Sequence, residues 1–359
     1  MRIKFFLSSL QLQRVVKRIN SFVDAGYDIE VFAFVRKGEP VNHLSFRFKY
    51  EIIGEYANEV SYFRRLPLLY KSIKSVSNWI NKGDLVYYFG IDVAMIGSFL
   101  IPNKYIYEEA DLVHTYINNK LISKLLEKID CRIIRKSAIT VMTSEGFAQF
   151  HFGSNIPDNI IFVPNKLNKE ILSCKSACKK DIDMSHIKFG FVGSLRFHSV
   201  YNFCKVIVEK FPQHEFHVYG IMSNDGQFRE FLSYPNFFYH GIFKNPKDLP
   251  DVYSNIDVVI STYDSDLVNV QYAEPNKLYE AIYFETPIIV SLNTFLYDKV
   301  NKMNVGYGVN CQYEESIKQF INSLSNEGLK ETKKNMASIG KAYCIDDISV
   351  LLKRIEGLN

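Results

Sequence analysis

Two consecutive α/β domains with doubly wound parallel sheets are the fold that this sequence predicts. Short runs of β-forming apolar residues alternate with helical patterns along the chain, which is typical of parallel sheets covered by helices. Some runs, such as 85–89 and 288–290, are apolar at every position, which indicates strands buried on both faces. A chain of 359 residues is long enough to form two cores.

The first half of the chain alternates between predicted strands and predicted helices. Strands are predicted at residues 2–8, 27–35, 45–53, 84–90, 104–108, 138–142 and 160–164. Helices are predicted at residues 11–25, 62–81, 92–101 and 111–135, and a further helix opens at 144. Gly26 ends the first helix, because glycine readily adopts the left-handed backbone found after helices. Apolar and polar residues alternate over 45–53, as in an edge strand.

Residues 171–186 have no periodicity and are predicted to link an N-terminal domain, residues 1–170, to a second domain, residues 187–340. Strands of the second domain are predicted at residues 187–193, 214–219, 236–240, 256–261 and 288–290. Its helices are predicted from the turn at 193–196 to about residue 211, at 225–233, at 249–255 and from 276 onward, and residues 313–359 are mostly helical. The two halves share an architecture but no detectable sequence repeat.

Composition restricts the class of protein and its partners. The six cysteines form no CxxC pair and no metal-ligand spacing, which predicts reduced thiols in a cytoplasmic protein and no metal site. The start of the sequence lacks the apolar core of a signal peptide, and no run approaches the ~18 apolar residues that span a bilayer.

Charge is divided unevenly along the chain. Residues 1–185 carry 26 Lys and Arg against 19 Asp and Glu, whereas the remaining residues carry 17 against 20. The basic half lacks nucleic-acid motifs, so we expect it to face an anionic membrane surface or an anionic lipid-linked substrate. Residues 62–81 combine basic and bulky apolar side chains, which fits either an interfacial helix or a helix packed on its own sheet.

Residues 274–291 read as a loop, a short helix, a turn and a buried strand. Pro275 excludes helix before it, and Asn276 is a suitable N-cap for the helix that follows. Lys277 lies in the first helical turn, where the helix dipole favours an anion over a cation. An anion bound at this helix start explains that lysine, and an exposed ion pair between Lys277 and Glu280 is the alternative.

A glycine turn opens the second domain's first helix. Gly193 follows a predicted strand, and Arg196 follows the glycine. Glycine lets a ligand approach the backbone, and arginine presents a planar fork that matches phosphate oxygens. Together with Lys277, Arg196 predicts a site for one anionic group at the carboxyl ends of the second sheet.

The first domain carries two further groups of charged residues. Glu108 and Asp111 follow a predicted strand, where ligand chemistry is expected in a parallel sheet, although Asp111 could instead cap the next helix. Arg14 and Arg18 share one face of the first helix with Lys17, which fits a solvated face or an anion-binding face.

These features together make the sequence resemble the retaining glycosyltransferases of family 4, which have two Rossmann-like domains that face each other across a cleft, the GT-B fold. The resemblance covers nearly the whole chain. The segments that carry it are Arg14–Arg18, Tyr107–Leu112, Val141–Glu145, Val163–Asn165, Phe191–Arg196, Pro275–Glu280 and Pro287.

The resemblance implies that the second domain binds a UDP- or GDP-linked sugar as a substrate, with no cofactor and no metal. Glu280 matches the glutamate that holds the ribose hydroxyls. Arg196 and Lys277 match the basic groups that contact the diphosphate, and Gly193 and Asn276 lie beside them in the donor-binding motifs.

The resemblance further implies that the first domain binds a glycan or lipid-linked acceptor. Asp111 and Glu108 would face the cleft as catalytic-side residues, with Arg14 and Arg18 on the acceptor side. The final helix, residues 341–359, is expected to cross back to the first domain. The implied role is surface polysaccharide assembly, such as capsule or O-antigen, in the cytoplasm or peripherally at the inner face of the cytoplasmic membrane.

The sequence departs from the family pattern near the donor site. Tyr272 stands where many members have a glutamate that contacts the donor sugar, which leaves Glu274 as the nearest acid for that role. Glu285 replaces a common glycine, and Ser8 and Ser9 replace a glycine-rich loop.

Two other functions fit the same frame. A sugar-nucleotide epimerase or hydrolase would need an acid–base set that the sequence does not show. A catalytically silent homologue that binds a nucleotide-sugar or a partner enzyme is favoured by Tyr272.

Overall fold

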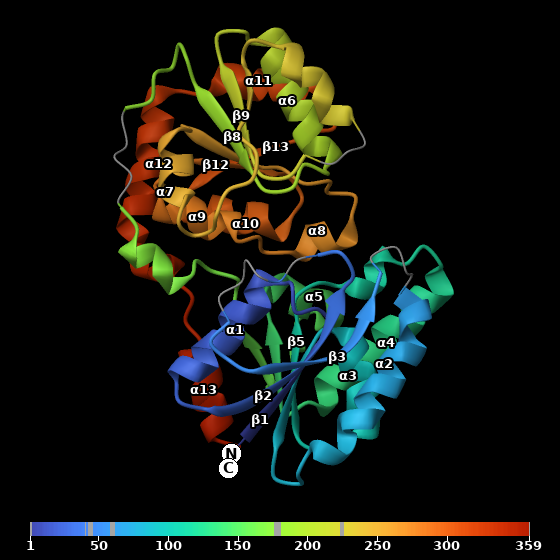
Figure 1. The fold of residues 1–359 in the computed structure, drawn as a ribbon. Helices are drawn as coiled ribbons and strands as arrows, with labels where there is room; N and C mark the ends of the chain where they lie inside the picture. Colours follow the sequence, from blue (N-terminus) through green and yellow to red (C-terminus); the bar gives the residue numbers. More distant parts are fainter. Residues whose placement is uncertain are drawn as a thin grey trace. The chain divides into compact units, whose positions relative to one another are not determined.

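The computed structural model describes residues 2–39, 41, 46–57, 62–175, 181–222 and 226–358. The chain divides into two compact units: Met1–Pro164 together with Asp347–Asn359, and Asn165–Asp346. Residues 176–180 of the predicted linker and residue 45 of a predicted strand lie outside the described residues. In each unit, helices cover a central parallel sheet (Figure 1), and the predicted α/β fold with two doubly wound sheets is confirmed.

The first unit has a seven-stranded sheet in the order β3-β2-β1-β4-β5-β6-β7, and its paired strands are parallel. The strands are β1 (Arg2–Leu7), β2 (Asp28–Arg36), β3 (Tyr50–Tyr56), β4 (Leu85–Phe89), β5 (Tyr105–Glu109), β6 (Ile139–Met142) and β7 (Ile160–Phe162). The helices are α1 (Gln13–Asp24), α2 (Tyr62–Val76), α3 (Ile91–Leu100), α4 (Lys120–Lys136), α5 (Glu145–Phe152) and α13 (Ser349–Glu356), with short 3-10 turns η1 (Ser77–Trp79) and η2 (Val113–Tyr116).

Helix α13 belongs to the first unit although it lies at the far end of the sequence. Leu351 and Ile355, one helical turn apart, are fully buried in the same cluster as Ile3 and Phe5 of β1. Arg354 donates to the backbone oxygen of Asp158 at 2.6 Å. The core of the first unit is therefore built from both ends of the chain.

The second unit has a six-stranded sheet in the order β10-β9-β8-β11-β12-β13, again with parallel pairs. The strands are β8 (Lys188–Val192), β9 (Glu215–Tyr219), β10 (Phe237–Tyr239), β11 (Val258–Ser261), β12 (Ile288–Ser291) and β13 (Gly306–Val309). The helices are α6 (His198–Lys210), α7 (Leu249–Ser254), α8 (Val268–Tyr272), α9 (Lys277–Tyr283), α10 (Phe295–Met303), α11 (Glu314–Ser323) and α12 (Asn326–Ile339), and the 3-10 turns are η3 (Lys169–Ser173), η4 (Gln227–Ser233) and η5 (Lys341–Cys344).

Several local predictions were wrong. The helix expected over 111–135 begins only at Lys120, because Asn119 caps it by accepting from the backbone N–H groups of Leu121 and Ile122. Asp111 therefore does not cap that helix. Residues 227–233 form a 3-10 turn instead of an α-helix. Strand β13 was not predicted, because Gly306 and Gly308 interrupt its apolar pattern.

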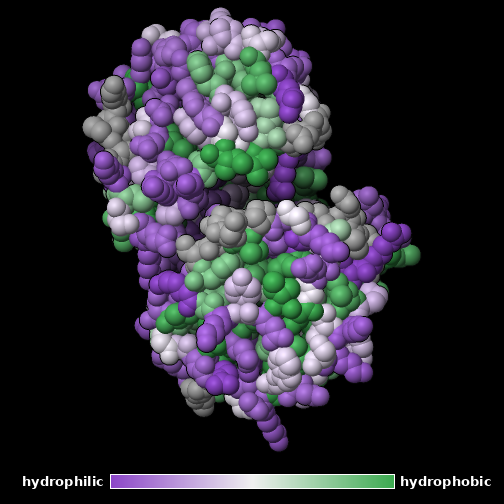
Figure 2. Space-filling view, viewed as in Figure 1, coloured by the Kyte–Doolittle hydropathy of each residue, from purple (hydrophilic) through white to green (hydrophobic). Residues whose placement is uncertain are grey.

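Helix α2 packs on its own unit along part of its surface. Leu69, Ile73 and Val76 are buried, whereas Tyr70 is exposed. No helix among the described residues is long and apolar enough to cross a membrane. On the face drawn in Figure 2, hydrophobic residues form several patches among hydrophilic ones. Contact of α2 with a membrane surface stays a prediction.

Candidate functional site

The strand order of the second sheet reverses at β8 and β11, and ligand sites of open α/β sheets lie at such a point. Gly193 follows β8 with φ +147°, and its N–H donates to the backbone oxygen of Tyr219 at 2.8 Å. A Cβ on Gly220 would lie 1.9 Å from the carbonyl oxygen of Gly193. These two glycines therefore let the ends of β8 and β9 meet backbone to backbone.

Helix α6 begins just after this turn, and a carboxylate already occupies its N-terminus. The Asp264 carboxylate accepts from the backbone N–H groups of Ser199 at 2.7 Å and His198 at 3.1 Å. Asp264 lies in the loop after β11, so this contact joins the two strands of the reversal point. The sequence analysis missed it, because Asp264 lies 65 residues from Ser199.

Arg196 is exposed beside this helix start. Its guanidinium lies 4.9 Å from the centre of the Phe197 ring, which packs edge-to-face against Tyr263. Among the residues that the structure describes, no carboxylate lies within ion-pairing distance of Arg196. Its charge is therefore available to an anionic ligand.

Glu280 is buried in α9, and three side chains donate to its carboxylate. Lys277 donates to Oε2 at 2.7 Å and Tyr253 to the same oxygen at 2.8 Å, while Asn276 donates to Oε1 at 2.7 Å. Burial and the negative charge of Glu280 raise the pKa of Tyr253, so its hydroxyl remains a donor. The carboxylate is thus fixed in one orientation.

The exposed ion pair considered from the sequence is wrong, because Lys277 is only 6% exposed and Glu280 only 1%. Asn276 stands at the N-cap position of α9, but its side chain caps no backbone N–H group and binds Glu280 instead. The first turn of α9 therefore holds a charged lysine against a carboxylate inside the protein.

Tyr263 connects this cluster electrostatically with Arg196. Burial raises the pKa of Tyr263, a hydrogen bond with Ser261 lowers it, the charge of Glu280 raises it and that of Arg196 lowers it. The backbone N–H of Tyr263 also donates to Oγ of Ser291 at the end of β12. Tyr263 thus lies close enough to both Glu280 and Arg196 for their charges to shift its pKa.

Glu274 belongs to a second buried group. Lys299 of α10 donates to its Oε1 at 2.7 Å, Tyr279 donates to the same oxygen, and Oε2 has no hydrogen-bond partner among the described residues. Lys166 lies over the rings of Tyr279 and Tyr343, and burial lowers its pKa. Glu274 is therefore ion-paired with Lys299, and Lys166 lies against the aromatic rings beside them.

In the first unit, Glu108 and Arg18 are each other's partners. Nε of Arg18 lies 3.3 Å from Oε2 of Glu108, Tyr87 donates to that same oxygen, and Arg18 also donates to the backbone oxygen of Val163 at 3.4 Å. Both side chains are almost wholly buried. The solvated face considered for Arg18 is thus wrong. Its pairing with Glu108 holds α1 against β5.

Asp111 and Arg14 form a looser pair nearer the surface. Nη1 of Arg14 lies 3.8 Å from Oδ2 of Asp111, and the two side chains are 28% and 46% exposed. Asp111 follows the carboxyl end of β5, where the sequence analysis expected it. Of the predicted residues in this unit, these two are the ones that a ligand can reach.

Three further acidic or histidine residues, from three elements of the first unit, could hold a metal ion: Glu109, Asp130 and His151. The sequence analysis predicted no metal-ligand set, because these residues are far apart in the chain.

The two α/β units, each with a parallel sheet, make up the GT-B fold. The neighbours of this chain among solved structures are GT-B glycosyltransferases. Anabaena Alr3699/HepE in complex with UDP is 13% identical, with 100% of this chain and 99% of that chain covered and a TM-score of 0.69. Sucrose-phosphate synthase from Thermosynechococcus elongatus is also 13% identical, with coverage of 100% and 98% and a TM-score of 0.70.

Another neighbour is a mutant of S. aureus TarM in complex with fondaparinux, alpha-GlcNAc-glycerol and UDP. It is 11% identical, with 99% of each chain covered and a TM-score of 0.67. No family model and no curated protein matches this chain. At such low identity, the similarity concerns the fold.

Proposed function

We propose that this protein is a retaining glycosyltransferase that transfers a sugar from a UDP-linked donor to a glycan or lipid-linked oligosaccharide acceptor in bacterial surface polysaccharide assembly. The observation that carries the proposal is the buried, oriented carboxylate of Glu280 beside Lys277 at the start of α9. The bound UDP and UDP-glucose in complexes of Anabaena Alr3699/HepE support a UDP-linked donor over a GDP-linked one.

Glu280 has capacity left for a nucleoside. An ionised carboxylate offers about four acceptor positions, and Asn276, Lys277 and Tyr253 use three of them. A ribose hydroxyl can take the remaining position on Oε1 while the donors hold the group in place. Because the carboxylate is already oriented, nucleotide binding does not have to offset the entropy cost of ordering this side chain.

Lys277 and Arg196 would stabilise the leaving diphosphate. Lys277 uses one of its three N–H donors on Glu280, and Arg196 has no carboxylate partner among the described residues. Cleavage of the bond between sugar and diphosphate increases negative charge on the phosphate oxygens, so these cations stabilise the transition state more than the bound donor. In a retaining transfer on one face of the sugar, the phosphate itself accepts the proton of the acceptor hydroxyl.

The first unit would bind the acceptor through Asp111 and Arg14, its two reachable site residues. Glu108 and Arg18 would keep β5 and α1 in place behind them. We further propose that the protein works in the cytoplasm at the inner face of the membrane, where lipid-linked acceptors are assembled and basic surfaces meet anionic lipids.

A donor panel tests this function. UDP, GDP and their sugars are screened by thermal shift and calorimetry, and nucleotide release is then measured with and without lipid-linked or oligosaccharide acceptors. Release that requires acceptor supports the transferase. Release or isomerisation without acceptor indicates a hydrolase or epimerase, and binding without turnover indicates a silent binding protein.

Two substitutions test the site. Lys277→Ala and Glu280→Gln are expected to weaken UDP binding by about 10- to 100-fold, the effect of losing a charge-assisted hydrogen bond of ~1.5–3 kcal/mol. Glu314→Gln is the matched control, because Glu314 pairs with Lys318 on the surface of α11. Unchanged UDP affinity and transfer in both site variants, with circular dichroism unaltered, would contradict the assignment.

A further inference from the structure

The first unit contains a buried group of two carboxylates and two histidines that the proposed reaction does not use. Glu109 is the last residue of β5, His114 lies in η2, Asp130 in α4 and His151 in α5. The side chains of all four are at most 2% exposed. Four elements of the unit therefore direct ionisable groups into one place that water does not reach.

The contacts within this group are incomplete. Nε2 of His151 lies 2.9 Å from Oε1 of Glu109, and Tyr107 donates to Oδ1 of Asp130 at 2.8 Å. Nδ1 of His114 lies 3.8 Å from Oδ2 of Asp130, which is too long for a hydrogen bond. One oxygen of each carboxylate therefore has a partner outside the pair. The two carboxyl groups also interact with each other, because burial, the charge of Asp130 and a hydrogen bond with Asp130 raise the pKa of Glu109.

Four buried polar atoms of the group have no hydrogen-bond partner among the described residues. They are Oε2 of Glu109, Oδ2 of Asp130, and both ring nitrogens of His114. Buried polar atoms in native proteins nearly always have partners, and each orphan has a cause such as a bound ion. The two carboxyl groups interact with each other, but both ring nitrogens of His114 lie beside them without a donor or acceptor, which indicates a bound group that these side chains share.

We propose that this group is a structural zinc site with Glu109, His114, Asp130 and His151 as ligands. One ligand atom from each of Glu109, Asp130 and His151 already lies within 4.8 Å of the others. Zinc lies about 2.0–2.2 Å from histidine nitrogens and carboxylate oxygens, so tetrahedral ligand atoms are about 3.3–3.6 Å apart. Nδ1 of His114, 3.8 Å from Oδ2 of Asp130, is the proposed fourth ligand.

Charge and ligand type favour zinc over other common ions. Two carboxylates and two neutral imidazoles balance the charge of a divalent cation in a dry site. Magnesium and calcium prefer all-oxygen shells, whereas imidazole nitrogen suits zinc. Four protein ligands leave no open position, which is typical of structural zinc.

The surroundings also orient the ligands. Tyr107 binds Oδ1 of Asp130 and leaves Oδ2 for the ion, and Sγ of Cys131 lies 3.6 Å from Nδ1 of His151 while Nε2 faces Glu109. Partners behind the ligands in this way fix ring orientation and raise metal affinity. The ion would join β5 to α4 and α5.

Zinc binding by the full-length protein tests the proposal. After chelator treatment, the protein is expected to take up about one zinc ion per chain, with release of protons and a rise in Tm. Cobalt is expected to give the strong visible absorption of a four-coordinate site. A folded protein that neither binds zinc nor shows this cobalt spectrum would overturn the proposal, leaving a proton shared by Glu109 and Asp130 as the occupant.

Two variants separate this site from adventitious binding. Asp130→Asn keeps the acceptor for Tyr107 but removes the charge, so zinc uptake is expected to fall at least tenfold. His114→Phe removes the orphaned nitrogens, so it is expected to fold without metal and to lose the zinc-dependent rise in Tm. His198→Gln, at an exposed histidine of the second unit, is the control and is expected to bind zinc as wild type does. Equal uptake in all three variants would contradict the assignment.

Discussion

Single buried carboxylates differ in how completely the protein satisfies their oxygens. Three donors fix Glu280, and Arg18 and Tyr87 fix Glu108. Glu274, by contrast, has one oxygen engaged and one without a hydrogen-bond partner among the described residues. A carboxylate with donors on both oxygens has a fixed orientation. A substitution at one of its donors therefore changes the position of the carboxylate as well as the local charge.

The pair of Arg18 and Glu108 gives a stability prediction. Arg18→Met is expected to lower the free energy of unfolding by ~3–5 kcal/mol, because it leaves the charge of Glu108 buried without its cation. Adding Glu108→Gln is expected to recover part of that loss, because the uncompensated charge is gone. Urea unfolding of the single and double variants measures both effects. A double variant no more stable than Arg18→Met would show that packing, and not charge, dominates.

Polar side chains near the ends of strands also join elements of the second unit. Asp264, in the loop after β11, satisfies two N–H groups at the start of α6, and Asp257 accepts from the backbone N–H of Lys188 at the start of β8. Such contacts tie a strand to the element beside it, so they fix the register of the sheet edge that carries the candidate site.

Removing the cap of α6 is expected to have a moderate cost. Asp264→Ala is predicted to destabilise the protein by about 1 kcal/mol, as for a lost N-cap, and Asp264→Asn by less, because the amide oxygen can still accept from one of the two N–H groups. Thermal unfolding of the two variants beside wild type measures the difference. Equal destabilisation by both variants would contradict this expectation and show that one amide oxygen does not replace the carboxylate.

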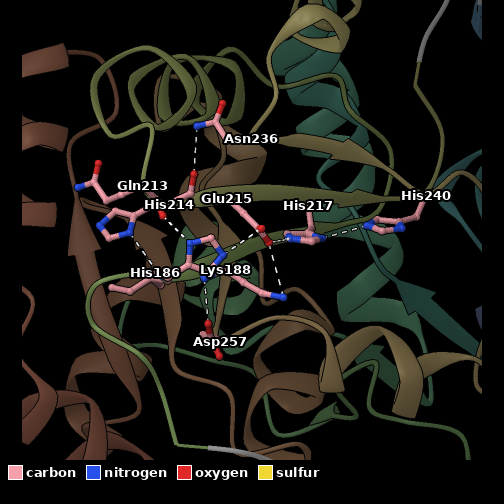
Figure 3. Close-up of polar contacts among 10 residues, drawn as sticks. His186, Lys188, Gln213, His214, Glu215, His217, Asn236, His240 and Asp257 are labelled. Atoms are coloured by element: carbon pink, nitrogen blue, oxygen red, sulfur yellow. Dashed lines mark hydrogen bonds and ion pairs between the residues drawn. The ribbon is translucent and has the colours of Figure 1, made fainter.

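A row of ionisable side chains crosses the β9–β10 edge of the same sheet (Figure 3). His240 faces His217 at 3.0 Å, His217 faces Glu215 at 2.7 Å, and His186 reaches the other oxygen of Glu215 at 3.0 Å. Burial lowers the pKa of His217, against the opposing effect of Glu215, and burial also lowers the pKa of His240. Burial raises the pKa of Glu215, but His217 and Lys188 together lower it below its ordinary value.

These shifts predict that acid destabilises the second unit. Below the ordinary histidine pKa of about 6.5, the unfolded chain binds protons that folded His217 and His240 resist, so stability falls as pH decreases. Glu215 extends the decline below about pH 4.5, because its carboxylate is favoured in the folded state. His217→Gln is expected to flatten the dependence of unfolding free energy on pH between about 7 and 5. An unchanged slope in His217→Gln, with His198→Gln as control, would contradict this cause.

The whole molecule consists of two units of which the first is discontinuous in sequence. Helix α13 completes its core through Leu351 and Ile355, and Lys104 donates to the backbone oxygen of Leu358 at 3.0 Å. The stability of the first unit therefore depends on residues that follow the entire second unit in the chain.

Truncating this contact is expected to destabilise one unit selectively. Leu351→Ala should cost ~2–5 kcal/mol, the usual range for a fully buried leucine. Hydrogen exchange should rise in β1 and β4 and remain unchanged in β8 and β11. Equal acceleration in both sheets would show that the two units unfold together.

The sequence predicted most strands of both sheets, because buried parallel strands are short apolar runs between turns. It also placed Lys277, Glu280 and Asn276 together, since they share one helical turn. Tyr253 and Asp264 were missed, because their contacts join residues from separate elements. The sequence left a solvated face and an anion-binding face open for Arg18 but did not reveal its buried pair, because helical periodicity does not show that Glu108 of β5 lies within pairing distance.

The position of α13 in the sequence affects when the first unit can complete its fold during synthesis. When residues 2–164 have emerged, the sheet that they form still lacks the apolar stripe of Leu351 and Ile355 over β1. The whole second unit, which ends at Asp346, is synthesised between the two parts of the first unit. During synthesis, the sheet of the first unit thus keeps an uncovered apolar face until residues 349–356 have been made.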